Sequence, residues 1–208
     1  MTIHILAISS SPRFNGNTET LLDEMIRGLN DSIAQTGRES EYQIEKIRLA
    51  ECNLMPCSQC DHCLKQGECT IQDDITGIYP KLLTADWFIL ASPIYFMAHC
   101  AQAKLLIDRC QAFWARRYVL KQSLMQPGQK FRRGIFISVG ATHGDKVFGG
   151  VKITMKWFLD ALEMEYWDNL LFEGCDKKGS IRQHPTALKD AYDLGRRIIN
   201  SSNRSGLR

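Results

Sequence analysis

"IHILAISSSPRFNGNTETLL", residues 3–22, is the stretch that indicates the fold class of this 208-residue chain. Its first seven residues form an apolar run that ends in turn-forming serines, which is typical of a buried parallel strand. Apolar residues then recur over 18–34 at the spacing of one helix face, at Leu21, Leu22, Met25, Ile26, Leu29 and Ile33. A strand that leads through a polar loop into an amphipathic helix is the first unit of a sheet with helical crossovers.

The same alternation continues along the chain. Further strands are predicted in "YQIEKIRL" from residue 42, in "WFILAS" at 87–92, in "GIFISVG" at 134–140 and near 166–172. Helices are predicted in "ITGIYPKLLTA", interrupted by Pro80, and at 101–114, 151–162 and 185–199. On the helix at 101–114 we expect Asp108 and Arg109 to face outward. Five strands that alternate with five helices predict an α/β fold, a doubly wound parallel sheet with helices on both faces, in one domain over 1–208.

Composition and charge limit the class of protein. With 44% apolar residues and a formal net charge of +3, the chain resembles an ordinary globular domain. The amino-terminal "MTIHILAISSSP" lacks a basic lead-in and a cleavage site, which predicts neither a signal peptide nor a membrane span. We therefore expect a cytoplasmic protein with no nucleic-acid or membrane partner. In a reducing compartment, clustered cysteines more often bind metal or do redox chemistry than form disulfides.

"CSQCDHCLKQGEC", residues 57–69, contains four of the eight cysteines in the spacing C-x2-C-x2-C-x5-C. Three thiolates at two-residue gaps can surround one cubane, and the fourth follows a short loop that Gly67 allows to turn. Zinc is the alternative, because four thiolates also satisfy a tetrahedral ion. An extra thiol at Cys52 leaves ligand exchange open, and His62 is a possible substitute ligand. We assign no chemistry to Cys100, Cys110 and Cys175. The predicted metal ligands are Cys57, Cys60, Cys63 and Cys69.

The loop "SSSPRFNGNTETLL", residues 9–22, follows the first strand and opens the first helix. Ligands of such folds bind beyond the carboxyl ends of the strands, and a helix N-terminus favours an anion there. The alternative is an ordinary turn in which Asn17 or Thr18 caps the helix. The loop matches neither of the common dinucleotide and nucleoside-triphosphate motifs. The predicted phosphate-binding residues are Ser9, Ser11, Arg13, Asn17 and Thr18.

Two later strand ends provide candidate contacts to a planar ring. In "ASPIYFMAH", residues 91–99, Pro93 stiffens the chain, and Ile94, Tyr95 and Phe96 offer a flat apolar surface. In "VGATHGDKVFGG", residues 139–150, a glycine-rich loop provides a possible far edge of the same site. The alternatives are that Tyr95 and Phe96 fill the core and that the second loop is simply flexible. The predicted residues of this second loop are Gly140, Thr142 and His143.

Taken together, "SSSPRFNGNTETLL", "ASPIYF" and "GATHG" resemble the flavin mononucleotide (FMN) loops of flavodoxin-like NAD(P)H-dependent reductases. The cysteine spacing resembles that of the iron-sulfur flavoproteins of anaerobic archaea and bacteria. The resemblance implies a five-stranded flavodoxin-like sheet of order 2-1-3-4-5, FMN at the three loops and a 4Fe-4S cluster on the four cysteines. It further implies that electrons enter from ferredoxin or a similar low-potential donor and leave to a small acceptor. No side chain is predicted to be catalytic, since the cofactors carry the chemistry.

Two other functions remain open. One is an NAD(P)H-dependent FMN or quinone reductase whose cysteines bind zinc or no metal, and the other is a pure electron carrier.

Charge is segregated along the chain. No acidic residue lies between Asp108 and Asp145, whereas the cysteine segment at 51–74 is acidic apart from Lys65. We predict a homo-oligomer, a dimer or tetramer, in which the basic segment of one subunit faces the acidic segment of another. One alternative is that the basic segment docks an acidic ferredoxin. The other is that it is simply a solvated connection. The basic residues are Arg109, Arg116, Arg117, Lys121, Lys130, Arg132 and Arg133.

Overall fold

The computed structural model describes residues 2–144 and 146–204 of the chain. Met1, Asp145 and residues 205–208 lie outside the described residues, so the acidic end of the basic segment is not part of the description. Among the described helices, none is both long and apolar enough to cross a membrane.

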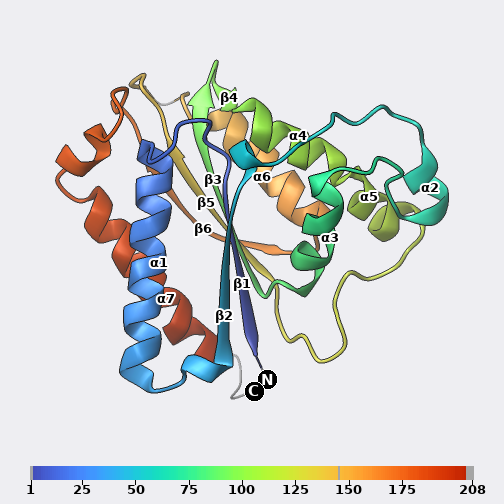
Figure 1. Cartoon of the computed structure of the whole chain (residues 1–208), viewed down its shortest axis with the longest axis horizontal. Helices are drawn as coiled ribbons and strands as arrows, with labels where there is room; N and C mark the ends of the chain where they lie inside the picture. Colours follow the sequence, from blue (N-terminus) through green and yellow to red (C-terminus); the bar gives the residue numbers. More distant parts are fainter. Residues whose placement is uncertain (1, 145, 205–208) are drawn as a thin grey trace.

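A central parallel sheet organises the chain (Figure 1). Its strands run in the order β2-β1-β3-β5-β6, and each neighbouring pair on this path is parallel. The short β4 (Ala98–His99) pairs antiparallel with the end of β3 and lies off this path. With β4 set aside, the predicted order 2-1-3-4-5 is confirmed. The five parallel strands are β1 (Ile3–Ser9), β2 (Tyr42–Arg48), β3 (Trp87–Tyr95), β5 (Arg133–Val139) and β6 (Glu165–Phe172).

Helices cover both faces of the sheet, as predicted (Figure 1). One face is covered by α1 (Asn17–Thr36) and α7 (Ala187–Arg204). Successive side chains of a strand point to opposite faces, so Ile5 and Ala7 pack under α1 and α7 while Leu6 and Ile8 belong to the other core. The other face is covered by α3 (Asp74–Thr84), α4 (Ala101–Arg109), α5 (Gln111–Trp114) and α6 (Gly149–Ala161).

Two glycines let α1 and α7 approach backbone to backbone. A Cβ atom added at Gly28 would lie 2.1 Å from the Tyr192 carbonyl oxygen, and one at Gly195 would lie 2.1 Å from that of Met25. No side chain fits at these distances. This contact fixes the position of α1, whose first turn lies at the carboxyl edge of the sheet.

The segment at 101–114 differs from its prediction. Instead of one helix, α4 ends at Arg109, α5 begins at Gln111, and a π-helical turn, η3 (Ala115–Val119), follows. Asp108 is exposed as predicted, but the prediction for Arg109 is wrong, because this residue is only 1% exposed. Its guanidinium is turned inward toward a carboxylate, as described below.

Smaller elements complete the chain. The cysteine stretch, predicted as a loop, contains the short helix α2 (His62–Gln66). The helix α3 runs through Pro80 without a break. Single 3-10 turns are η1 (Glu39–Glu41), η2 (Leu49–Glu51) and η4 (Ser180–Gln183).

Candidate functional site

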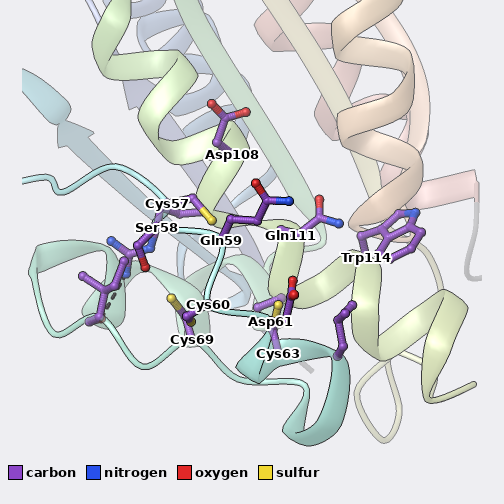
Figure 2. A pocket seen from close by; sticks show the side chains of 14 residues that line it. Cys57, Ser58, Gln59, Cys60, Asp61, Cys63, Cys69, Asp108, Gln111 and Trp114 are labelled. Atoms are coloured by element: carbon purple, nitrogen blue, oxygen red, sulfur yellow. Dashed lines mark hydrogen bonds between the residues drawn. The ribbon is translucent and has the colours of Figure 1, made fainter.

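The four cysteines of the C-x2-C-x2-C-x5-C motif line one cavity of about 490 Å³ (Figure 2). We call it the cysteine cavity. Its other wall comes from α4 and α5, through Asp108, Arg109, Gln111 and Trp114 among others. All four side chains are free thiols. Residues that lie within thirteen positions of one another in sequence are therefore gathered on one side of a single space.

The thiols are close enough to influence one another electrostatically. Burial raises the pKa of Cys63, and the like charges of Cys57, Cys69 and Cys60 raise it further. A hydrogen bond from the backbone of His62 lowers the pKa of Cys60, and contact with Thr70, at 3.6 Å between Sγ and Oγ1, acts in the same direction. A set of four thiolates is the donor set of iron-sulfur clusters and of structural zinc.

The cysteine cavity is large enough for a cluster. Zinc requires its four sulfurs about 2.3 Å from one point, whereas a cluster carries its thiolates around a volume. Within the described residues, no three His, Cys, Asp or Glu side chains form a group that could hold one metal ion. The four cysteines line one side of a cavity of about 490 Å³. The cavity therefore has room for a cage of several metal atoms, and four cysteines on its wall provide the donor set.

The two additional candidate ligands lie elsewhere. Cys52 is directed to the backbone, with its Sγ 3.4 Å from the Arg48 carbonyl oxygen. His62 is exposed on α2. Neither is among the described residues that line the cysteine cavity.

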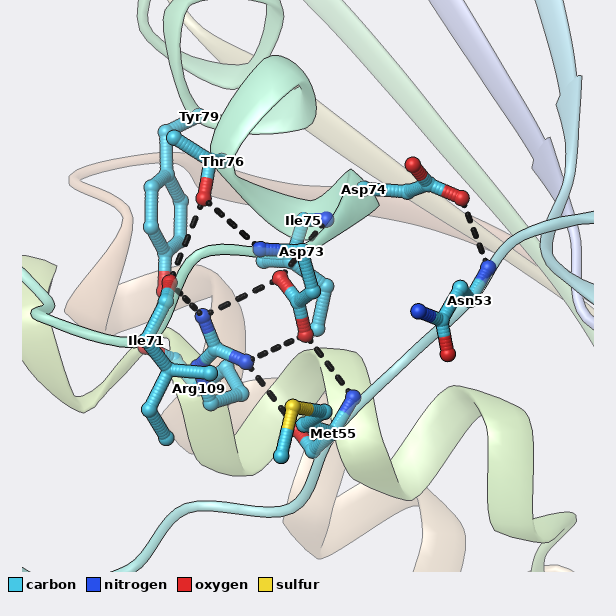
Figure 3. A network of polar contacts seen from close by, with 9 residues as sticks. All are labelled: Asn53, Met55, Ile71, Asp73, Asp74, Ile75, Thr76, Tyr79 and Arg109. Carbon is cyan, nitrogen blue, oxygen red and sulfur yellow. Dashed lines mark hydrogen bonds and ion pairs between the residues drawn. The ribbon is translucent and has the colours of Figure 1, made fainter.

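A buried ion pair joins the two ends of the four-cysteine stretch (Figure 3). The Arg109 guanidinium donates to both Asp73 carboxylate oxygens, at 2.6 and 3.2 Å. It also donates to the Met55 carbonyl oxygen and to the Ile71 carbonyl oxygen, each at 3.0 Å. Both charged side chains are 0% exposed. Because Met55 precedes the first cysteine of the motif and Ile71 follows the last, Arg109 holds the two ends of the segment together.

The carboxylate of Asp73 has a second role in this network. It accepts from the Met55 amide at 2.8 Å, and it caps α3 by accepting from the Ile75 amide at 3.0 Å. Burial raises the pKa of Asp73, but hydrogen bonds from Arg109 and Met55 outweigh it and hold the pKa below its usual value. The pair therefore consists of full charges at neutral pH.

A second arginine supports the middle of the segment. Arg116 donates from Nε to the Gly67 carbonyl oxygen at 2.7 Å and lies 3.5 Å from the Glu68 carboxylate. Gly67 has φ of +70°, and a Cβ atom there would lie 2.6 Å from Cγ of Arg116. The predicted turn at Gly67 therefore requires glycine both for its backbone and for its contact.

Contacts within the chain involve several charges of the basic segment, and the predicted contact between subunits stays a prediction. Arg109 and Arg116 pair with the acidic cysteine segment of their own chain. Arg132 is buried and donates to the Leu162 and Leu82 carbonyls. Two further pairs are Arg117 with Asp160 and Arg133 with Glu165.

A second cavity, of about 150 Å³, lies at the carboxyl ends of β1, β3 and β5. We call it the strand-end cavity. It brings together seven of the residues predicted to bind FMN: Ser11, Arg13, Asn17, Thr18, Pro93, Ile94 and Tyr95. The prediction did not include Ala141, nor Cys175 and Asp176, which follow β6. The rule that ligands bind at strand ends could have pointed to these last two, because they follow the fifth strand.

The start of α1 is suited to an anion. The residue before the helix, Gly16, makes no side-chain cap, so the alternative in which Asn17 or Thr18 caps the helix is wrong. The Thr18 hydroxyl is buried and has no hydrogen-bond partner among the described residues, and it lies on the wall of the strand-end cavity. A buried donor without a partner beside the positive end of a 20-residue helix fits a phosphate oxygen.

Asn17 has a structural role that the sequence did not indicate. Its amide donates to the Cys175 carbonyl oxygen at 3.2 Å and to the Lys177 carbonyl oxygen at 3.0 Å. Arg13 donates to the Asp176 carbonyl oxygen at 3.2 Å. These two side chains fasten the loop after β6 to the loop after β1.

Five of the predicted residues are not among the described residues that line the strand-end cavity: Ser9, Phe96, Gly140, Thr142 and His143. Ser9 is buried in β1 with an unpartnered hydroxyl, and Gly140 is buried at the end of β5. Phe96 is fully exposed, and Tyr95 is partly exposed, so the alternative that these aromatics fill the core is wrong. Thr142 and His143 are exposed, and His143 lies 3.4 Å from the Glu173 carboxylate.

Sequence reasoning also missed Glu19, a buried carboxylate in the first turn of α1. It accepts from the Asn15 amide at 2.8 Å and forms ion pairs with Lys46 at 3.0 Å and Arg48 at 2.8 Å. Burial raises the pKa of Glu19, but its hydrogen bonds and the two cations lower it below the usual value. The charged carboxylate therefore holds the loop after β1 against β2.

The sheet order and the polar loops at its carboxyl edge define a flavodoxin-like protein. The family model of NADPH-dependent FMN reductases matches residues 3–166. The chain belongs to this family of flavin-dependent oxidoreductases.

Iron-sulfur flavoproteins are among the curated proteins that are similar in sequence. An iron-sulfur flavoprotein of Archaeoglobus fulgidus is 32% identical over 205 residues, which cover 94% of this chain and 93% of that protein. An iron-sulfur flavoprotein of Methanocaldococcus jannaschii is 42% identical over 105 residues, and the match spans half of each chain.

Solved structures agree on the fold. The NAD(P)H:quinone oxidoreductase from Methanothermobacter marburgensis superimposes with a TM-score of 0.65 at 15% identity and covers 95% of this chain and 96% of its own. An FMN-dependent NADH-azoreductase of Bacillus anthracis, solved in complex with FMN, gives the same TM-score and identity and covers 95% and 99%.

Proposed function

We propose that this chain is an iron-sulfur flavoprotein that transfers electrons from a low-potential donor such as ferredoxin, through a 4Fe-4S cluster and FMN, to a small acceptor. The observation that carries the proposal is the cysteine cavity, where Cys57, Cys60, Cys63 and Cys69 line one space. Membership of an FMN reductase family and the iron-sulfur flavoproteins among its relatives support both cofactors. When bound, a 4Fe-4S cluster carries electrons singly, and FMN carries one or two.

In this proposal the strand-end cavity holds FMN. The unpartnered Thr18 hydroxyl and the first amides of α1 bind its phosphate, and Arg13 adds positive charge. Pro93, Ile94 and Tyr95 at the end of β3 provide the apolar surface beside the ring. Asn17 holds the loop at 175–181 over the same cavity.

In the cysteine cavity the four thiolates would be the ligands of the cluster, and α4 and α5 limit the access of water from the other side. Arg109 holds the backbone of the ligand segment at its two ends, and Arg116 holds it in the middle, at Gly67. No protein side chain is assigned a proton-transfer role.

The direct test is analysis of protein purified without oxygen. We expect about four irons and four acid-labile sulfides per chain, together with FMN. The variants Cys57→Ala and Cys63→Ala should lose the iron and sulfide and keep FMN. The matched control Cys52→Ala, which lies outside the motif and lines neither cavity, should keep all three. Wild-type protein free of iron and sulfide would contradict the cluster, and protein free of FMN would contradict the flavin site.

The second candidate is a pyridine-nucleotide-dependent reductase, which the name of the matching family favours. Anaerobic mixing experiments separate the two. If the cluster delivers the electrons, reduced ferredoxin should reduce the flavin rapidly in the wild type and slowly in Cys63→Ala. Rapid reduction by NADPH that is equal in both proteins would favour the second candidate.

We also propose that the protein is a homo-oligomer. The cysteine cavity and the strand-end cavity have no lining residue in common among those described, so a second copy is a way to bring the two cofactors near each other. Large apolar side chains are exposed at the turn after β3, through Phe96 and Met97, and on α6, through Ile153 and Trp157. Native mass measurement should find a dimer or tetramer, and a monomer at low salt and native concentration would overturn this part.

A further inference from the structure

Arg109 belongs both to the buried ion pair and to the wall of the cysteine cavity. It lines the cavity together with Cys69, whereas its partner Asp73 is not among the described lining residues. Its Nε is buried and has no hydrogen-bond partner among the described residues. The positive member of the buried pair therefore contributes to the cavity wall, whereas the negative member is not among the described lining residues.

The charges of the pair are permanent and poorly screened. Burial alone would lower the pKa of Arg109, but the hydrogen bonds with Asp73 raise it above its usual value. Asp73 is held ionised by the same contact. Both side chains are 0% exposed, so solvent and salt screen their field much less than that of a surface pair.

We propose that Arg109 is a positioning residue that raises the reduction potential of the cluster bound by Cys57, Cys60, Cys63 and Cys69, with Asp73 as the opposing charge. This inference rests on the proposed function. Reduction adds one electron to the cluster from a chemical donor such as dithionite, and no bond forms or breaks. Arg109 and Asp73 keep their charges throughout. A nearby positive charge stabilises the more negative, reduced state.

The sign of the effect distinguishes this role from a purely mechanical one. If Arg109 and Asp73 only tie Met55 to Ile71, removing either should loosen the segment and affect the cluster in the same direction. If their charges set the potential, removing Arg109 should lower it, and removing the charge of Asp73 should raise it. Asparagine is suited to the second change because it still caps α3.

The experiment is an anaerobic redox titration of the intact protein, followed by the paramagnetic resonance signal of the reduced cluster. At a fixed solution potential, Arg109→Gln should decrease the reduced-to-oxidised ratio of the cluster about tenfold, which equals about 59 mV for a one-electron couple. Asp73→Asn should increase the ratio at least about threefold. The matched control is Arg116→Gln, because Arg116 contacts Gly67 and Glu68 of the same segment, and it should change the ratio less than about twofold.

The outcomes separate this inference from the proposed function. Ratios within twofold of wild type in both Arg109→Gln and Asp73→Asn, or shifts in the same direction, would overturn the inference and leave the proposed function intact. If Arg109→Gln loses its cluster, the test uses Asp73→Asn and Arg109→Lys instead. An increased reduced-to-oxidised ratio in Asp73→Asn, with a ratio near wild type in Arg109→Lys, supports the role of the charge. Any other result overturns the inference. A wild-type protein without iron would overturn the proposed function itself.

Discussion

The two cavities are supported in different ways. The strand-end cavity lies directly on the sheet, and its walls are the loops that follow β1, β3, β5 and β6. The cysteine cavity lies beyond α4 and α5, on a segment that takes no part in the sheet (Figures 1 and 2). Many small contacts hold the loops of the strand-end cavity. One buried ion pair, between Arg109 and Asp73, joins the two ends of the segment that carries the cysteine cavity. A single substitution should therefore affect the two regions very differently.

The largest effect is expected from removal of the ion pair that holds the cysteine segment. Arg109→Met leaves the Asp73 carboxylate buried without its counter-charge, which should lower the free energy of unfolding by about 3–5 kcal/mol. Urea titration of the reduced, metal-free protein measures it. The control Arg27→Met removes the ion pairs of a largely exposed arginine with Glu24 and Asp31 on α1 and should cost less than about 0.5 kcal/mol. A loss below about 1 kcal/mol for Arg109→Met would remove the contrast between the cavities.

Acid should lower the free energy of unfolding through one buried histidine in β4, beside the end of β3. His99 in β4 is 8% exposed, and burial first, with Lys104 as a like charge, lowers its pKa to about 4. As pH falls below about 6.5, the unfolded chain binds a proton at this residue that the folded chain does not bind until about pH 4. The free energy of unfolding should therefore fall by about 1.4 kcal/mol per pH unit over this window.

The matched variants test this pH dependence. Unfolding midpoints in urea should depend less on pH in His99→Phe than in the wild type between pH 6.5 and 4. The control His62→Gln, on the exposed face of α2, should keep the wild-type dependence. An unchanged slope in His99→Phe would mean that other groups cause the acid sensitivity.

A moderate effect is expected from crowding the helix pair that positions the strand-end cavity. Gly28→Ala places a Cβ atom 2.1 Å from the Tyr192 carbonyl oxygen, so α1 and α7 must separate. We expect a loss of about 1–3 kcal/mol in unfolding free energy and weaker FMN binding, with the iron content unchanged. Gly77→Ala is the control, since nothing lies within 4 Å of its added Cβ. If Gly28→Ala lost iron instead of FMN affinity, the two cavities would not be supported independently.

The smallest effect is expected from one brace of the strand-end cavity. Asn17→Ala removes the hydrogen bonds to the Cys175 and Lys177 carbonyls. Each is worth about 1 kcal/mol, so the dissociation constant of FMN from the apoprotein should rise about fivefold to thirtyfold. Fluorescence titration measures it, and Asn30→Ala, exposed on the same helix, should leave the constant unchanged. An unaffected Asn17→Ala would show that the loop at 175–181 does not depend on this brace.

Local patterns predicted most of the fold and part of the site. Strand and helix periods follow from which side chains avoid water, and this information is present along the chain itself. The predicted sheet order and the helices on both faces are confirmed by the structure. Seven of the predicted flavin residues line one cavity for the same reason, since loops after parallel strands meet at one edge.

Arg109 shows where such patterns fail. A periodic pattern places a charged side chain on the solvent face of a helix, because it contains no information about distant partners. Arg109 is buried because Asp73, 36 residues earlier, and the carbonyls of Met55 and Ile71 together replace its water. The same reason explains why Glu19 and the bracing role of Asn17 were missed, since their partners lie on other elements.

By itself, the sequence determined the alternation of strands and helices, the four-cysteine spacing and the polar loops at strand ends, because each is a local property of neighbouring residues. Only the tertiary structure decided that the four thiols line one space, that the strand-end loops share another, and that basic and acidic segments pair within one chain. Burial is the physical reason. A charge gains a strong partner only where folding removes its water, and that place is a property of the whole chain.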